Sequence, residues 1–142
     1  MVNYWYIKIA GSKCKKFDDI LKKSIEGNIK SIGIGYYIYE NYNNINKEYR
    51  DNIWINNKKD IKKTENIFNK FINQMKINDI VFLCKGAYQI MYIATISGNY
   101  YYDDSFRTEF PEYSLPHRRE ITNIIEFNTK SPKRMVGNIY KV

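Results

Sequence analysis

The segment from residue 80 to residue 103 constrains the fold more than any other part of the sequence. It contains three runs rich in β-branched and aromatic residues, with Gly86 and Gly98 in the short connections between them. Short glycine-containing connections join antiparallel neighbours, so the pattern predicts three consecutive antiparallel strands. The predicted strands are 80–85, 88–97 and 99–103. The side chains expected to point into the core are Val81, Leu83, Ile93 and Ile96.

Residues of the same types predict three further strands, at 3–9, 29–38 and 118–127. Two glycines, Gly33 and Gly35, interrupt the second of them, and glycine inside a strand marks a bulge or a close approach of another backbone. Tyr36 and Tyr37 follow directly. If the strand continues through both, their side chains lie on opposite faces.

Apolar residues recur at helical spacing in two segments, 17–25 and 60–75. Gly27 fits the left-handed residue that follows a helix end, and Asp60 or Thr64 is expected to cap the second helix.

The remaining long segments carry weaker patterns. Residues 39–59 are rich in asparagine and are predicted to form a long loop with at most one short helix. Residues 128–142 are predicted to form a basic tail. The fold class expected is α+β: a small curved antiparallel or mixed β-barrel of about six strands, flanked by two or three helices. A length of 142 residues fits a single domain, 1–142.

Several classes of function lack support in the residues. No apolar run is long enough to span a membrane, and with only two cysteines, in unrelated contexts, a reducing cytoplasm is the expected compartment. Cys84 lies in an apolar run and is expected to be a core thiol. The only histidine, His117, precedes two arginines, which favour its cation over a catalytic base. We therefore expect no catalytic residues, no metal and no cofactor.

The remaining signal is positive charge interleaved with aromatic rings. The chain carries 23 basic and 15 acidic residues, a net charge of +8, and 16% of its residues are aromatic. An AT-rich genome explains the lysine count but not the clustering of the basic residues. Cationic side chains hold phosphates, and aromatic rings stack on bases. The clusters are Lys13, Lys15 and Lys16, then Arg118 and Arg119, and finally Lys130, Lys133 and Arg134.

The order of several segments resembles a known family. The opening strand Tyr4-Trp5-Tyr6-Ile7-Lys8 is followed by Ile32-Gly33-Ile34-Gly35-Tyr36, Asn78-Asp79-Ile80-Val81, Ile96-Ser97-Gly98-Asn99-Tyr100 and His117-Arg118-Arg119-Glu120. This arrangement resembles the EVE-like branch of the PUA-like superfamily, which is related to YTH domains. It is most similar to the N-terminal domains of McrB-type, modification-dependent restriction proteins. The family usually has tryptophan where this chain has Tyr36, and Gly-Asp where it has Asn78-Asp79.

The resemblance implies a DNA-binding module that flips a modified, methylated base into an aromatic cage. The expected base pocket comprises Trp5, Gly33, Gly35, Tyr36, Tyr37, Tyr88 and Tyr100, with only one of Tyr36 and Tyr37 facing the cavity. The expected phosphate-binding residues are Lys13, Lys15, Lys16, His117, Arg118 and Arg119. The partner would be modified double-stranded DNA. An NTPase motor and a nuclease would lie on the same longer protein or on an associated subunit.

Three other functions stay open from the sequence. They are an RNA-binding PUA-like module that reads modified or structured RNA, a PUA-like hydrolase or nuclease, and a protein-interaction domain whose charge reflects genome composition. The type of modification, the flanking sequence and the oligomeric state are not encoded in any motif.

Overall fold

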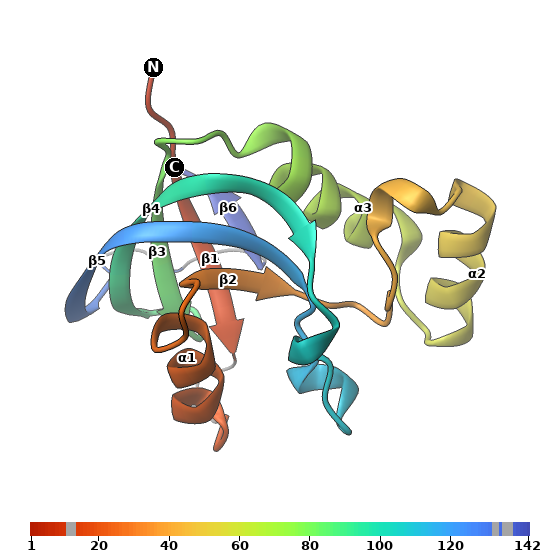
Figure 1. The fold of residues 1–142 in the computed structure, drawn as a ribbon, viewed down its shortest axis with the longest axis horizontal. Helices are drawn as coiled ribbons and strands as arrows, with labels where there is room; N and C mark the ends of the chain where they lie inside the picture. The colour runs from red at the N-terminus through yellow and green to blue at the C-terminus, as the bar shows by residue number, and fades with distance from the viewer. Residues whose placement is uncertain (11–13, 132–133, 135–137) are drawn as a thin grey trace.

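The fold is a six-stranded mixed sheet that curls into a half-barrel, with three α-helices around it (Figure 1). The computed structural model describes residues 1–10, 14–131, 134 and 138–142. The strand order is β2-β5-β4-β3-β1-β6. The strands are β1 (Tyr4–Ala10), β2 (Ser31–Ile34), β3 (Ile80–Lys85), β4 (Gln89–Tyr102), β5 (His117–Lys130) and β6 (Ile139–Lys141). The predicted α+β class, with a small curved sheet and flanking helices, is confirmed.

The curl comes from β4 and β5, which arch together across the molecule (Figure 1). Each has 14 residues, and their antiparallel register shifts at three places. Such shifts bend and twist a strand pair. Gly98 lies within one of them, between Ile96 and Tyr100, so 88–97 and 99–103 form one strand and the turn predicted at Gly98 is wrong. A Cβ at Gly98 would lie 2.9 Å from the Cβ of Glu120, so this glycine permits close strand contact.

The core lies inside the curl. Val81, Leu83 and Ile96 are fully buried, as predicted, whereas Ile93 is only half-buried because Ala94 and Ile96 occupy the inward positions of β4. Gly86 has a φ of 66° in the β3–β4 turn, as expected for a glycine turn. Cys84 is buried, as predicted, and burial raises the pKa of its thiol to about 12.

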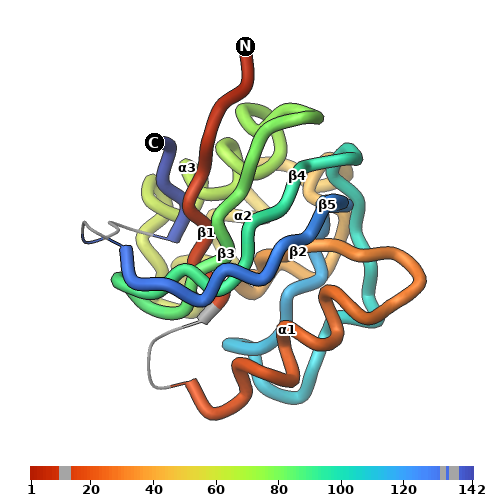
Figure 2. Tube along the Cα trace, turned by 90° about the vertical axis from the view of Figure 1, so that its left-hand side faces the viewer, coloured from red at the N-terminus to blue at the C-terminus, as the bar shows by residue number. Residues whose placement is uncertain are grey.

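The two chain ends lie side by side at one end of the sheet (Figures 1 and 2). β6 pairs antiparallel with β1, and the Val142 amide donates to the Tyr4 carbonyl at 2.9 Å. The tail predicted at 128–142 therefore contains a strand that the sequence pattern did not reveal. On its other side β1 pairs with β3 in parallel, which makes the sheet mixed.

The helices are α1 (Phe17–Ile25), α2 (Lys47–Asn56) and α3 (Ile61–Asn69), and α3 continues into a π-helical turn at 70–74. Figure 1 shows α1 at one side of the sheet and α2 and α3 together at another. Asp60 caps α3 by accepting from the Lys63 amide, as predicted. Gly27 does not adopt the predicted left-handed conformation, because α1 ends on Glu26 in a right-handed one.

The segment 39–59 is more ordered than predicted. It holds a short 3₁₀ turn at Tyr42–Asn44 and the ten-residue helix α2. Of the residues in α2, only Trp54 is fully buried, so the helix lacks a repeating apolar stripe. Its start is marked by Asn46, whose side chain accepts from the Tyr49 amide.

Candidate functional site

A cavity of about 240 Å³ opens beside the end of β2. Its wall comes from β1, from β2 and the turn after it, from the α2–α3 connection, and from the loop that precedes β5. The residues around it are Lys8, Ile9, Gly33, Ile34, Gly35, Tyr36, Tyr37, Lys59, Pro111, Glu112, Ser114, Leu115 and Asn138. The structure thus places four of the predicted pocket residues, Gly33, Gly35, Tyr36 and Tyr37, on one cavity.

Tyr36 and Tyr37 form a tight turn with unusual backbone geometry. Their φ angles are 52° and 66°, and the Ile38 amide donates to the Gly35 carbonyl at 3.3 Å. The left-handed region costs a non-glycine residue roughly 1–2 kcal/mol. Because β2 ends at Ile34, the two side chains are not forced to opposite faces, and both line the cavity. The prediction that only one of them could do so is wrong.

Contacts from distant segments hold the turn in this conformation. The Trp54 indole Nε1–H donates to the Tyr36 carbonyl at 3.0 Å, and Asn138 Nδ2 donates to the Tyr36 hydroxyl. The edge of the Tyr36 ring packs against Phe68, with 6.1 Å between centroids. Burial raises the pKa of Tyr36 to about 12, so its hydroxyl is neutral at physiological pH. Strained backbone of this kind persists only where its surroundings fix it.

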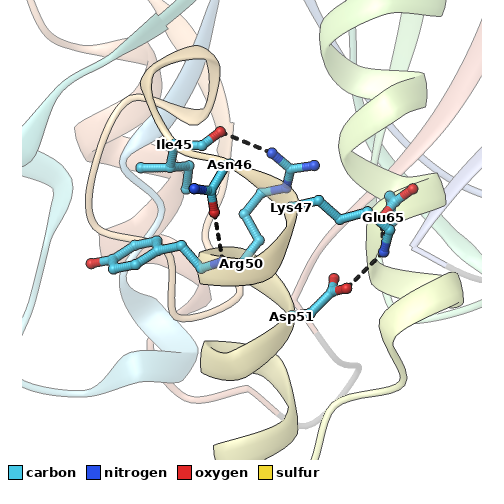
Figure 3. Close-up of polar contacts among 7 residues, drawn as sticks. Ile45, Asn46, Lys47, Arg50, Asp51 and Glu65 are labelled. Carbon is cyan, nitrogen blue, oxygen red and sulfur yellow. Dashed lines mark hydrogen bonds and ion pairs between the residues drawn. The ribbon is translucent and has the colours of Figure 1, made fainter.

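Polar contacts tie the start of α2 to α3 and to the loop before it (Figure 3). Lys47 Nζ lies 2.7 Å from Asp51 within α2 and 3.5 Å from Glu65 on α3. Arg50 Nη1 donates to the Ile45 carbonyl at 3.0 Å and holds the preceding loop to the helix. These contacts hold α2 to α3, and the connection between the two helices carries Lys59 of the cavity.

The glycines of β2 let another chain segment pass very close. A Cβ at Gly33 would lie 2.5 Å from the Leu115 carbonyl oxygen, and one at Gly35 would collide with the Ser114 carbonyl. Any larger residue would push the 114–115 segment away from the cavity wall. The close approach that the sequence predicted for these glycines is present.

The cavity is bordered by two cations and one carboxylate. Lys59 Nζ lies 5.6 Å from the centroid of the Tyr37 ring and 6.0 Å from that of Tyr36, within the range of cation–π attraction. Lys8 and Glu112 complete the charged border. An aromatic wall beside a positive border suits a planar ring attached to an anionic group.

The other predicted cage residues lie elsewhere. Trp5 is buried in the core, and its indole Nε1–H donates to Asp79 Oδ2 at 3.0 Å. Tyr100 packs on His117, and Tyr88 is exposed beside a different cleft. The prediction of one cage shared by Trp5, Tyr88, Tyr100 and the tyrosine pair is therefore wrong. The aromatic wall of this cavity consists of Tyr36 and Tyr37.

The predicted phosphate contacts at the start of β5 are also wrong. His117, Arg118 and Arg119 are each no more than 2% exposed. Alternation along β5 sends the two arginines to opposite sides. Arg118 donates to Ser31, Leu115 and Ser24 near α1, and its guanidinium lies 3.6 Å from the Phe106 ring centroid.

Arg119 and His117 point to the opposite side of β5 from Arg118. Arg119 donates to the carbonyls of Phe71, Met75 and Gly98 at 2.8–3.0 Å, which satisfies the end of the π-helical turn. His117 Nε2 lies 2.7 Å from the Ile38 carbonyl, which can only accept, so this nitrogen carries the proton. Nδ1 then accepts from the Tyr100 hydroxyl at 2.7 Å. Burial lowers the pKa of His117 to about 4, so the ring is neutral rather than cationic.

The lysines before α1 differ among themselves. Lys15 and Lys16 are exposed, and Lys16 lies 4.0 Å from Asp19. Lys13 lies outside the described residues.

The sequence patterns did not indicate four charged or polar residues of the cavity, which are Lys8, Lys59, Glu112 and Asn138. Lys59 and Asn138 lie in segments predicted as loop or tail, where no periodic pattern indicates which way a side chain points.

A search of protein families matches residues 5–138 to a family described as a domain of unknown function, DUF8426. The match spans nearly the whole sheet and the entire cavity wall. The chain belongs to this family. No curated protein matches the chain.

Two further observations bound the chemistry of this family member. Among the described residues, no group of three or more His, Cys, Asp and Glu side chains is placed to hold a metal ion. None of the helices in the described part of the chain has the length and apolar composition of a membrane span.

Proposed function

We propose that this domain is a DNA-binding module that takes a modified base, extruded from the duplex, into the cavity beside Tyr36 and Tyr37. The observation that carries the proposal is the tyrosine pair, held with left-handed backbone on one wall of a cavity with a basic border. Strained backbone clusters at ligand sites, where it fixes side chains for binding.

The size of the cavity supports one base as its occupant. Sites for drug-sized ligands measure about 300–1,000 Å³, and this cavity is smaller, at about 240 Å³. Stacking on an aromatic side chain contributes roughly 1–3 kcal/mol per base. Aromatic walls also favour a methyl group, because they offer apolar contact that water does not.

Polar groups around the cavity can read the edge of a base. Glu112 can accept from an exocyclic amino group, as acidic side chains do with cytosine. The backbone at Gly33 and Gly35 also lines the cavity and can contribute further polar groups. Extrusion of a base costs a few kcal/mol, and phosphate contacts from Lys8 and Lys59 offset part of that cost.

The resemblance to McrB-type proteins extends the proposal to a biological role. The module would direct a restriction system to modified DNA, while an NTPase and a nuclease elsewhere would supply the chemistry. Reading RNA instead of DNA is a separate outcome, which the same titration distinguishes.

The test is a set of binding titrations with the wild type, Tyr37→Ala and Tyr49→Ala. Tyr49 is an exposed tyrosine of α2 outside the cavity and serves as the matched control. The probes are duplexes with a single 5-methylcytosine or N6-methyladenine, their unmodified counterparts, and RNA of the same sequences. We expect Tyr37→Ala to weaken binding to one modified duplex by about 1–3 kcal/mol and Tyr49→Ala to leave it unchanged. Equal affinity of the wild type for modified and unmodified duplexes would overturn the proposal.

A further inference from the structure

We infer that a second cleft, at the β3–β4 turn, binds the phosphate backbone of a nucleic-acid strand while Tyr88 stacks on one of its bases. This basic cleft has a volume of about 550 Å³ and lies apart from the cavity of Tyr36 and Tyr37. This inference rests on the proposed function, because both assume that the domain binds nucleic acid. The residues along it are Lys85, Ala87, Tyr88, Gln89, Asn128, Thr129, Lys130 and Arg134.

The register of the sheet places two lysines along the cleft, Lys85 and Lys130, in one row across the strands. Lys85 pairs with Gln89 across the β3–β4 hairpin, and Gln89 pairs with Lys130 across β4 and β5. Directly paired residues of antiparallel strands lie on the same face, with about 4.5–5.5 Å between Cβ atoms of neighbours. The register therefore places Lys85 and Lys130 on either side of Gln89, on three hydrogen-bonded strands.

The described residues along this cleft carry positive charge and no negative charge. The described residues along it include three cations and no carboxylate, and none of the three cations forms an ion pair with a described acidic residue. Lys85 Nζ lies 4.9 Å from the centroid of the Phe17 ring, which keeps it over the start of α1. Clustered cations that form no ion pair favour a polyanion as the ligand.

Tyr88 gives the basic cleft a ring that is free to stack. It lies beside the glycine turn of the hairpin and is 56% exposed, in contrast to Tyr36. Next to Tyr88 in the sequence, Gln89 donates from Nε2 to Asn128 Oδ1 at 2.9 Å, so an amide pair bridges β4 and β5 in the cleft. Cations that follow a backbone, together with an aromatic platform, are the elements of single-strand binding sites.

An anionic membrane also attracts cations, but the cleft lacks the other requirement for membrane binding. Interfacial binding depends on apolar side chains that enter the lipid. Apart from Tyr88, the described lining offers amides, a hydroxyl and Ala87 rather than large apolar side chains. A nucleic-acid strand fits this composition better, and vesicles become an arm of the test.

The first experiment compares Lys85→Gln/Lys130→Gln with the control Lys62→Gln/Lys63→Gln, which removes the same charge from exposed positions on α3. Binding to an unmodified single-stranded DNA, to the matched duplex and to phosphatidylserine vesicles is measured from low to moderate salt. With the duplex, the slope of log affinity against log salt should fall by roughly 1.8 in the cleft variant, about 0.9 for each cation, and stay unchanged in the control. An equal slope in both variants would overturn the inference, as would a loss confined to phosphatidylserine vesicles.

The second experiment replaces Tyr88 with Ala and with Phe and measures binding to the single-stranded DNA. Stacking needs only the ring, so Tyr88→Ala should weaken binding between about 5- and 150-fold while Tyr88→Phe retains it. Unchanged binding in Tyr88→Ala would contradict the stacking role. The proposed function fails separately: its failure appears as lost discrimination between modified and unmodified duplexes, whereas these variants should weaken both alike.

Discussion

Two pairs of adjacent residues, Tyr36-Tyr37 and Arg118-Arg119, both look like ligand contacts in the sequence, yet they occupy opposite environments. They lie close together, since Gly33 of β2 pairs with Arg118 of β5. The tyrosines line an open cavity, and the arginines are buried. The difference shows that residue chemistry alone does not tell a binding group from a structural one. The deciding factor is whether the fold buries the side chain among hydrogen-bond partners, as it does the two arginines, or leaves it on the wall of a cavity.

The arginines are buried because the fold offers them acceptors. Burying a cation is costly unless hydrogen bonds replace its water. Arg119 donates hydrogen bonds to three carbonyls. Arg118 donates to the carbonyl and the hydroxyl of Ser31, to the Leu115 carbonyl and to the Ser24 hydroxyl. Their burial, at no more than 2% exposure, keeps both guanidinium groups out of reach of a phosphate. The tyrosines, in contrast, have their backbone fixed by Trp54 while their rings face the cavity.

The largest effect should come from removing a buried arginine. Arg119→Met would leave the carbonyls of Phe71, Met75 and Gly98 without this donor, and each buried acceptor left unpaired costs about 1–3 kcal/mol. Urea denaturation should show this loss in the free energy of unfolding, with Lys62→Met as the exposed control. A loss of affinity for DNA with stability unchanged would instead assign Arg119 to the phosphates.

A smaller effect should follow from acid acting on His117. The unfolded chain protonates this ring near pH 6.5, but the folded protein does so only near pH 4. The unfolded state therefore binds more protons between these values, and stability falls as the pH drops from 6.5 to 4, by about 3 kcal/mol in all. Denaturation at a series of pH values should show this slope, and His117→Gln should lack that component. Identical pH profiles for the two proteins would contradict a buried neutral histidine.

The smallest effect measures the backbone strain at Tyr37. Tyr37→Gly and Tyr37→Ala both remove the ring, but only glycine adopts a φ of 66° without cost. The glycine variant should be more stable than the alanine variant by roughly 1 kcal/mol. At Tyr88, whose φ is not positive, glycine should give no such advantage. Equal stabilities of the two variants at position 37 would mean that the turn stores no strain.

The strands that alternate regularly could be predicted from the sequence, whereas elements defined by long-range pairing could not. β1 and β3 follow from their residue types, and so does the Gly86 turn. Gly98 looks like a second turn but permits close packing of β4 against β5, which depends on Glu120 far along the chain. β6 has only three residues, and its pairing with β1 carries no local signal.

The candidate site was also predictable only where its residues form a local pattern in the sequence. The glycines of β2 and the tyrosines after them form a local pattern, and they do meet at one cavity. Trp5 could not be separated from the core, because a tryptophan on a strand packs as well as it stacks. Lys59 and Asn138 reach the cavity only through tertiary structure, so no spacing in the sequence relates them to Tyr36.

The most direct test of the central claim is a photochemical crosslink from the base itself. A duplex carries 5-iodocytosine or 8-bromoadenine at the modified position, according to the base that the titrations select. The complex is irradiated, and the attached peptide is identified by mass spectrometry. We predict that the base attaches to Tyr36 or Tyr37. If Tyr37 is the attached residue, the crosslink should be lost in Tyr37→Ala. Attachment only outside the cavity, for example at Tyr88 or Lys16, would contradict the claim that this cavity receives the base.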